Sequence, residues 1–221
     1  MKDIGKAFSF MFEDPSWVKK VVIAALFMLL SVVGLGIFVL LGYFVELTQR
    51  VIRREQYALP EWKDVGVKFV LGFKYFILLG VYALPVILLA IPLMVLTAVT
   101  AISGVSETLS AFLALYTIGF VLLLIPYILL YVLVTPIITY RFALRERISD
   151  GLDVGGIMNE FGRNWQNTLV VALISVGLET FAGIGILVFI VGILFTMFYA
   201  YAVAGYMYGE LCLSAQEGAA A

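Results

Sequence analysis

The chain has 221 residues, of which 63% are hydrophobic and 13% charged, and its formal net charge is −1. Several apolar runs exceed the roughly 20 residues that cross a hydrocarbon core about 30 Å thick, so the composition indicates a polytopic integral membrane protein. With no histidine and a single cysteine, Cys212, the sequence argues against histidine acid–base chemistry and zinc hydrolysis and excludes an internal disulfide; we expect neither a cofactor nor a metal site.

The first unit, about residues 1–56, begins with a stretch that predicts an amphipathic helix in the membrane interface. Its apolar residues follow helical spacing. They are Ile4, Phe8, Met11 and Phe12. Asp14 as N-cap and Pro15 at the first helical position then predict the start of a membrane-crossing helix.

A Gly-x-Gly sequence, Gly34 and Gly36, interrupts the first apolar block. A helix over residues 15–33 would be about 28 Å long, and a return helix over about 37–53 would have a similar length. We therefore expect a hairpin with these two glycines at its tip. The alternative is a single span, which would leave the first four lysines on the outer side, against the usual distribution of basic residues.

The middle unit, about residues 57–148, predicts an amphipathic helix after Leu59-Pro60-Glu61-Trp62 and then spans over about 75–100 and 108–140. Both spans contain prolines. These are Pro85, Pro92, Pro126 and Pro136. Broken helices can expose backbone carbonyls to a substrate path, and kinks that let overlong helices fit the bilayer are the alternative interpretation.

The third unit, about residues 149–214, repeats the first, and residues 215–221 are expected to form a flexible tail. Trp165 precedes Gly183 and Gly185 much as Trp17 precedes the first glycine pair, with the first glycine 18 residues after Trp165 and 17 after Trp17, so these glycines are the predicted tip of the last hairpin. Small residues then recur in the last helix, where they would allow close helix packing, either internal or between copies. They are Ala200, Ala204, Gly205 and Gly209.

All fourteen Lys and Arg residues can be placed on one side of the membrane if the chain forms three such repeats. The predicted fold is therefore all-α, with three interfacial amphipathic helices, three hairpins making six membrane helices (five if the first block spans once), and both termini in the cytoplasm. Among the basic residues, Arg141, Arg145 and Arg147 could contact anionic lipid headgroups. Glu46 and Arg50 are spaced for an i,i+4 pair, which we interpret as structural, with an ion site as the alternative.

Several short motifs together resemble a known family. They are Asp14-Pro15 with Trp17 and Lys19-Lys20, Gly42-Tyr43, Arg50 and Arg53, Leu59-Pro60-Glu61-Trp62 with Asp64, Tyr82 with Pro85, and Tyr208-Gly209. In this set the chain is similar to a prokaryotic membrane family catalogued as domain of unknown function 4013. The resemblance implies a multi-pass protein of a bacterial or archaeal plasma membrane, and it carries over no catalytic residue.

The sequence favours a non-enzymatic membrane protein, either a scaffold that shapes the bilayer or a small subunit of a larger assembly, because interfacial helices on one leaflet respond to curvature and lipid composition. The alternative is a small channel or permease along the proline-kinked helices. Expected partners are the lipid bilayer with its anionic headgroups and other membrane proteins or a second copy. No motif supports nucleic-acid binding or catalysis.

Overall fold

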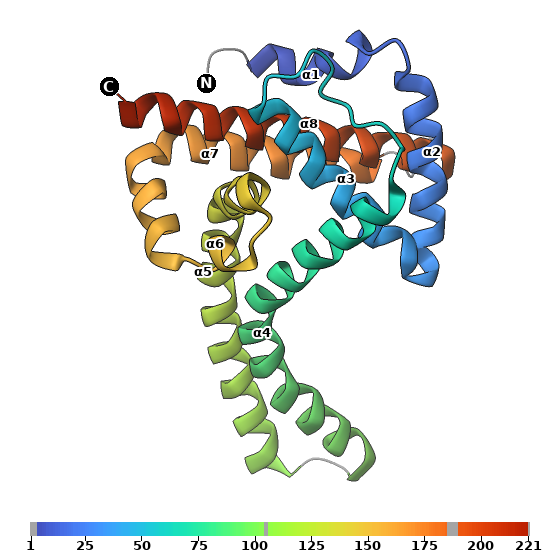
Figure 1. The fold of residues 1–221 in the computed structure, drawn as a ribbon. Coiled ribbons are helices and arrows are strands. Elements are labelled where there is room, and N and C mark those ends of the chain that lie inside the picture. Colours follow the sequence, from blue (N-terminus) through green and yellow to red (C-terminus); the bar gives the residue numbers. More distant parts are fainter. Residues whose placement is uncertain (1–3, 104–105, 185–189, 221) are drawn as a thin grey trace. The chain divides into compact units, whose positions relative to one another are not determined.

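The computed structural model describes residues 4–103, 106–184 and 190–220, and over these residues the fold is all-helical (Figure 1). The helices are α1 (Ile4–Glu13), α2 (Trp17–Leu30), the 3-10 helix η1 (Ser31–Val33), α3 (Leu35–Ile52), α4 (Val65–Ser103), α5 (Glu107–Arg145), α6 (Ile148–Gly151), α7 (Val154–Ile184) and α8 (Ile190–Ala220). The predicted all-α class is confirmed.

Long apolar helices of the membrane-crossing type are also present. Among the described residues, three are long and apolar enough to cross a bilayer, in α3, α4 and α5. A fourth is obtained if α1 and α2, which meet at a bend of 94°, are taken together as one span. The prediction of a membrane protein with several apolar helices is thus supported, and the arrangement of six spans in three repeats stays a prediction.

Several helix boundaries differ from those predicted. α2 begins at Trp17, two residues later than expected, because the Asp14 carboxylate accepts a hydrogen bond from the Ser16 N–H (2.8 Å) and holds the chain in a turn. In the middle unit, the predicted amphipathic helix and the following span form the single helix α4, which runs through Pro85 and Pro92 without a break. In the third unit, the predicted amphipathic helix and the first span of the hairpin are joined in α7, across a non-helical Asn164 (φ −126°, ψ 25°).

The chain divides into two compact units. The core unit comprises Met1–Leu78 and Leu133–Ala221, and the hairpin unit comprises Leu79–Val132. Inside the core unit, α7 and α8 lie side by side, and α3 packs against both α2 and α8 (Figure 1). The largest fully buried side chains of this unit include Leu47, Ile138, Phe142, Met207 and Leu211. Their burial supplies the hydrophobic contacts that hold the core unit together.

The hairpin unit pairs the distal half of α4 with the first part of α5. The Tyr116 hydroxyl donates to the Leu89 carbonyl (2.8 Å), and the Tyr127 hydroxyl donates to the carbonyl of Tyr82. Many other side chains of this unit are large, apolar and exposed. Examples are Leu88, Met94, Val95, Leu115, Leu122, Leu123 and Leu129. Exposed apolar surface of this extent suits contact with lipid chains, since backbone polar groups are satisfied inside each helix.

α3 and α4 approach each other closely at two glycines. A Cβ atom on Gly72 would lie 1.7 Å from the Phe38 carbonyl oxygen, and one on Gly42 would lie 1.8 Å from the Lys68 carbonyl oxygen. These distances are far inside van der Waals contact, so any side chain here would push the helices apart. Glycine is therefore required at both positions by packing, as at small-residue contacts in membrane helix pairs.

We predict that Gly72→Ala lowers the stability of the folded protein by about 1–3 kcal/mol, because the added methyl group has no space. Gly80→Ala is the matched control: it lies in the same helix with open space around it, and it should be neutral or slightly stabilising through higher helix propensity. Thermal unfolding of both variants in detergent measures the difference. Equal midpoints for the two variants would contradict the packing assignment.

Candidate functional site

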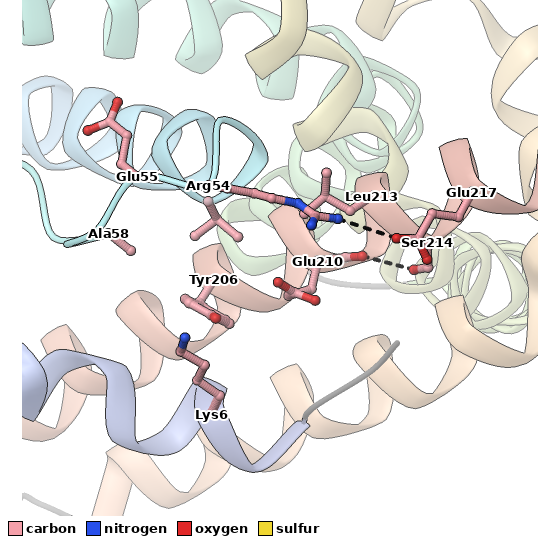
Figure 2. Close-up of a pocket in the computed structure, with 10 residues that line it drawn as sticks. Lys6, Arg54, Glu55, Ala58, Tyr206, Glu210, Leu213, Ser214 and Glu217 are labelled. Atoms are coloured by element: carbon pink, nitrogen blue, oxygen red, sulfur yellow. Dashed lines mark hydrogen bonds and ion pairs between the residues drawn. The ribbon is translucent and has the colours of Figure 1, made fainter.

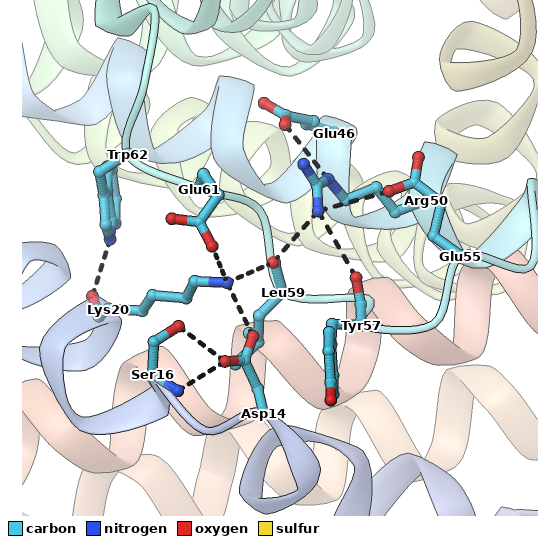
Figure 3. Close-up of polar contacts among 10 residues, drawn as sticks. All are labelled: Asp14, Ser16, Lys20, Glu46, Arg50, Glu55, Tyr57, Leu59, Glu61 and Trp62. Carbon is cyan, nitrogen blue, oxygen red and sulfur yellow. Dashed lines mark hydrogen bonds and ion pairs between the residues drawn. The ribbon is translucent and has the colours of Figure 1, made fainter.

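A buried lysine at the start of α2 organises the charged side chains of the core unit (Figure 3). The Lys20 side chain is only 3% exposed, and its Nζ lies 2.7 Å from Asp14 Oδ2 and 2.8 Å from Glu61 Oε1. It also donates to the Leu59 carbonyl (2.9 Å). An ammonium group has three donors, and here all three have acceptors. We call Lys20, Asp14, Glu61 and the Leu59 carbonyl the Lys20 cluster.

Both carboxylates of this cluster are set to be ionised. Burial raises the pKa of Asp14, but hydrogen bonds from Lys20 and Ser16 outweigh this effect and hold the pKa below its usual value. At Glu61, the hydrogen bond from Lys20 lowers the pKa despite partial burial. The cluster is therefore one buried cation shared between two anions, a geometry that stabilises the ammonium far better than a single partner would.

Trp62 attaches the connector between α3 and α4 to the same place. Its Nε1–H donates to the Lys20 carbonyl (2.9 Å), and its ring stacks on Tyr43 and Phe27 at centroid distances of 4.4 and 5.0 Å. No pattern in the sequence predicts this long-range contact, and the one available signal is the Leu-Pro-Glu-Trp motif itself.

A second cluster forms around Glu46. Arg50 Nε lies 3.4 Å from Glu46 Oε1, so the predicted i,i+4 partners are in contact, and Lys68 Nζ lies 2.5 Å from Glu46 Oε2. Arg50 also contacts Glu55 (3.4 Å) and the Leu59 carbonyl (3.4 Å). The Leu59 carbonyl thus accepts from Lys20 and from Arg50, which joins the two clusters into one network (Figure 3).

The end of α3 is where other helix ends meet. Gln49 Nε2 donates to the Ala143 carbonyl (2.9 Å) and to Glu146 (3.0 Å) at the end of α5. Arg54, just after α3, lies 3.3 Å from Glu217 near the end of α8. Lys68, in the first turn of α4, contacts Glu46 of α3 and so brings the start of α4 to the same region. Charged ends of four helices therefore converge within the core unit.

The three arginines predicted to contact lipid headgroups have different surroundings. Arg141 is bound within the protein, by Glu160 (2.8 Å) and Asp153 (2.6 Å). Arg145 and Arg147 are exposed. Arg145 also lies 3.7 Å from Asp150, so the side chains of Arg141 and Arg145 both have carboxylate partners within the protein.

The predicted hairpin-tip glycines lie at helix ends or outside the described residues. Gly34 separates η1 from α3 in a left-handed conformation (φ 85°), which glycine adopts without strain. A Cβ atom on Gly36 would lie 1.9 Å from the Phe27 carbonyl oxygen, so this glycine allows α2 and α3 to pack closely. Gly183 is in the last turn of α7. Gly185 lies outside the described residues.

The small residues of α8 pack inside this chain. Ala200 and Ala204 are buried. A Cβ atom on Gly205 would lie 3.0 Å from Leu47, and one on Gly209 would lie 2.6 Å from Val51. Both glycines therefore face α3. Of the two uses predicted for this stripe, internal packing is the one that these contacts support.

A pocket of about 310 Å³ opens beside these clusters (Figure 2). Its walls come from α1, the end of α3, the connector and the end of α8. The lining residues are Lys6, Val51, Arg54, Glu55, Ala58, Tyr206, Glu210, Leu213, Ser214 and Glu217. In the part of the chain that the structure describes, no three Cys, Asp or Glu side chains are grouped as a metal site requires.

Comparison with known families shows which family the chain belongs to. Residues 23–197 match DUF4013, a family described as a protein of unknown function. The chain belongs to this family. Neither a curated protein nor a solved structure matches it significantly. In this DUF4013 protein the matched residues run from α2 into the first part of α8 and include Trp62, Glu61 and the Glu46 cluster, whereas Lys20 and α1 precede them.

We predict that Lys20→Met destabilises the DUF4013 protein by about 3 kcal/mol, because it leaves the Asp14 carboxylate buried without a cation. Adding Asp14→Asn should recover part of the loss. Lys19→Met is the matched control, since Lys19 is the exposed neighbour on the same helix turn, and it should change stability little. Thermal unfolding in detergent distinguishes these outcomes; similar losses for both lysine variants would argue against the cluster.

Proposed function

We propose that this DUF4013 protein is a non-enzymatic integral membrane protein that organises its surroundings, as a membrane-shaping scaffold or as a small subunit of a larger assembly. The observation that carries the proposal is the surface of α1. Phe10 stacks on Tyr206 of α8 (4.6 Å), and Ala7 and Met11 are buried beside it. A separate face of the same short helix stays exposed and apolar.

That exposed face consists of Ile4, Phe8 and Phe12, which are 37%, 37% and 50% exposed. Tyr199 of α8 donates its hydroxyl to the Phe8 carbonyl (2.9 Å), which fixes the helix in place. An apolar face held beside paired charges suits insertion at the boundary between headgroups and acyl chains, where binding scales with buried apolar area. α1 would then occupy space in one leaflet only.

We further propose that both termini face the cytoplasm of a bacterial or archaeal plasma membrane, with the basic residues on that side. The convergence of charged helix ends supports this proposal. The end of α3, the start of α4 and the end of α5 are joined by contacts of Gln49 and Lys68, so these apolar helices have their basic ends at one place. Retention of Lys and Arg on the cytoplasmic side then gives the orientation.

Single cysteines placed in a Cys212→Ser background should reveal this orientation. Ser9→Cys and Ser149→Cys, both at exposed positions, should react with a membrane-impermeant thiol reagent only after cells are opened. Ser106→Cys, at the exposed start of α5, should react in intact cells. Labelling of Ser9→Cys from outside would instead support the single-span alternative for the first apolar block.

A small channel or permease is the second candidate. Pro85 and Pro92 lie seven residues apart inside α4, and each removes one helix hydrogen bond. The carbonyls of Val81 and Leu88 are the acceptors that lose a donor. Unpaired carbonyls along one helix can line a path for a solute.

Reconstituted liposomes separate the two candidates in one preparation. For the scaffold, Phe8→Ser with Phe12→Ser should bring vesicle shape close to that of protein-free liposomes, because the apolar face no longer inserts, while Pro85→Ala with Pro92→Ala should change little. Phe112→Ser is the control, an exposed phenylalanine of the hairpin unit. Cryo-electron microscopy measures vesicle shape and an entrapped dye measures flux. Saturable flux abolished by the proline substitutions would refute the scaffold.

A further inference from the structure

The pocket of the core unit has the size and the chemistry of a ligand site. Its volume of about 310 Å³ lies at the lower end of the range for small-molecule sites. α1 contributes the basic residue Lys6, the segment after α3 contributes Arg54, and α8 contributes Glu210 and Glu217. Both signs of charge therefore face the same small volume (Figure 2).

The charged residues of the pocket include one ion pair and one carboxylate that has no ion-pair partner among the described residues. Arg54 is paired with Glu217 at 3.3 Å, and this exposed pair closes one end of the pocket. Glu210 is half-buried, and its carboxylate makes no ion pair with any residue that the structure describes. A ligand that brings an N–H donor would satisfy this carboxylate, while Lys6 and Arg54 offer donors to an anionic group.

The pocket lies where helices change from apolar to charged. α3 ends at Ile52, immediately before Arg53 and Arg54, and the charged residues of α8 are in its last turns. Val51, Ala58 and Leu213 supply apolar wall beside the charged groups. For a protein embedded in a bilayer, such a transition marks the headgroup layer. A lipid headgroup could enter here without leaving the membrane.

We propose that this pocket binds the headgroup of a zwitterionic phospholipid with a primary ammonium, of the phosphoethanolamine class. The ammonium would donate to Glu210, and the phosphate would accept from Lys6 and Arg54. Choline fits less well, because a quaternary ammonium has no N–H donor and is bound by aromatic cages, whereas Tyr206 is the one aromatic residue among the pocket's lining residues. An anionic glycerol headgroup fits less well, because it would face the acidic wall of α8 without a cation to offer.

The inference rests on the membrane-embedded part of the proposed function and not on the choice between scaffold and channel. The experiment uses the full chain in nanodiscs of phosphatidylcholine that contain either phosphatidylethanolamine or phosphatidylglycerol at equal fractions. Native mass spectrometry counts the lipids that stay bound after release from the disc. We expect phosphatidylethanolamine to be retained over both others, with about a five- to ten-fold preference.

Glu210→Gln should strongly reduce this preference, because the neutral amide oxygen can accept a hydrogen bond but has no negative charge to pair with the ammonium. Lys6→Gln should reduce retention of all phospholipids at the site. Glu13→Gln and Lys19→Gln are matched controls, exposed residues outside the pocket, and should retain the wild-type preference. The preference is a ratio within one preparation, so a partly unfolded variant does not imitate the loss. Free phosphoethanolamine, added to the wild type, tests whether the headgroup alone competes.

Equal retention of phosphatidylethanolamine and phosphatidylcholine, or an unchanged preference in Glu210→Gln, overturns the headgroup site. A preference for phosphatidylglycerol overturns it in favour of an anionic lipid site. Competition by free phosphoethanolamine at lipid-like concentrations would assign the pocket to a soluble aminophosphate and overturn the lipid assignment. Failure of the chain to insert into any nanodisc would instead refute the proposed membrane function itself.

Discussion

The buried ammonium group of Lys20 is the constraint on which the rest of the core unit depends. Removing a charge from water costs several kcal/mol, so the group is stable only with its acceptors all in place. Those acceptors come from the turn before α2 and from the connector after α3. Because the Leu59 carbonyl also accepts from Arg50, the same requirement fixes the connector against α3. The irregular connector is thereby held by contacts of Leu59, Glu61 and Trp62 with α2 and α3.

Outside the charged network, close packing at glycines holds the helices of the core unit in position. Gly36, Gly42 and Gly72 let the backbones of α2, α3 and α4 approach closely, and Gly205 and Gly209 give space to side chains of α3 that pack on α8. α3 therefore contacts partners along much of its length, with its charged end in the network and its other end at the Gly34 turn. Helices packed at this distance cannot slide without collision, so the position of the charged ends relative to one another is set by packing as well as by ion pairs.

The functional proposals depend on what this rigid arrangement leaves exposed. α1 is anchored through Phe10 and Tyr199, so its free apolar face is held at a constant place beside the charged helix ends. The pocket that α1 helps to line combines a half-buried Glu210 of α8 with Lys6 of α1 and with Arg54, which follows α3. An anchored interfacial helix next to a headgroup site would bind differently as lipid composition and leaflet packing change. A membrane-organising protein requires such a response.

The sequence by itself determined the membrane class, the all-helical fold and the contact of Glu46 with Arg50, because these follow from hydrophobicity and from spacing within one helix. It did not predict that the amphipathic helix of the middle unit and the span after it join into the single helix α4, since no turn residue is needed where both segments have helical spacing. Only the tertiary structure decided the partners of Lys20 and the stacking of Trp62. The hydrogen bonds of Lys20 with Leu59 and of Trp62 with Lys20 join residues about 40 positions apart, and no local period records which side chains a folded chain brings together.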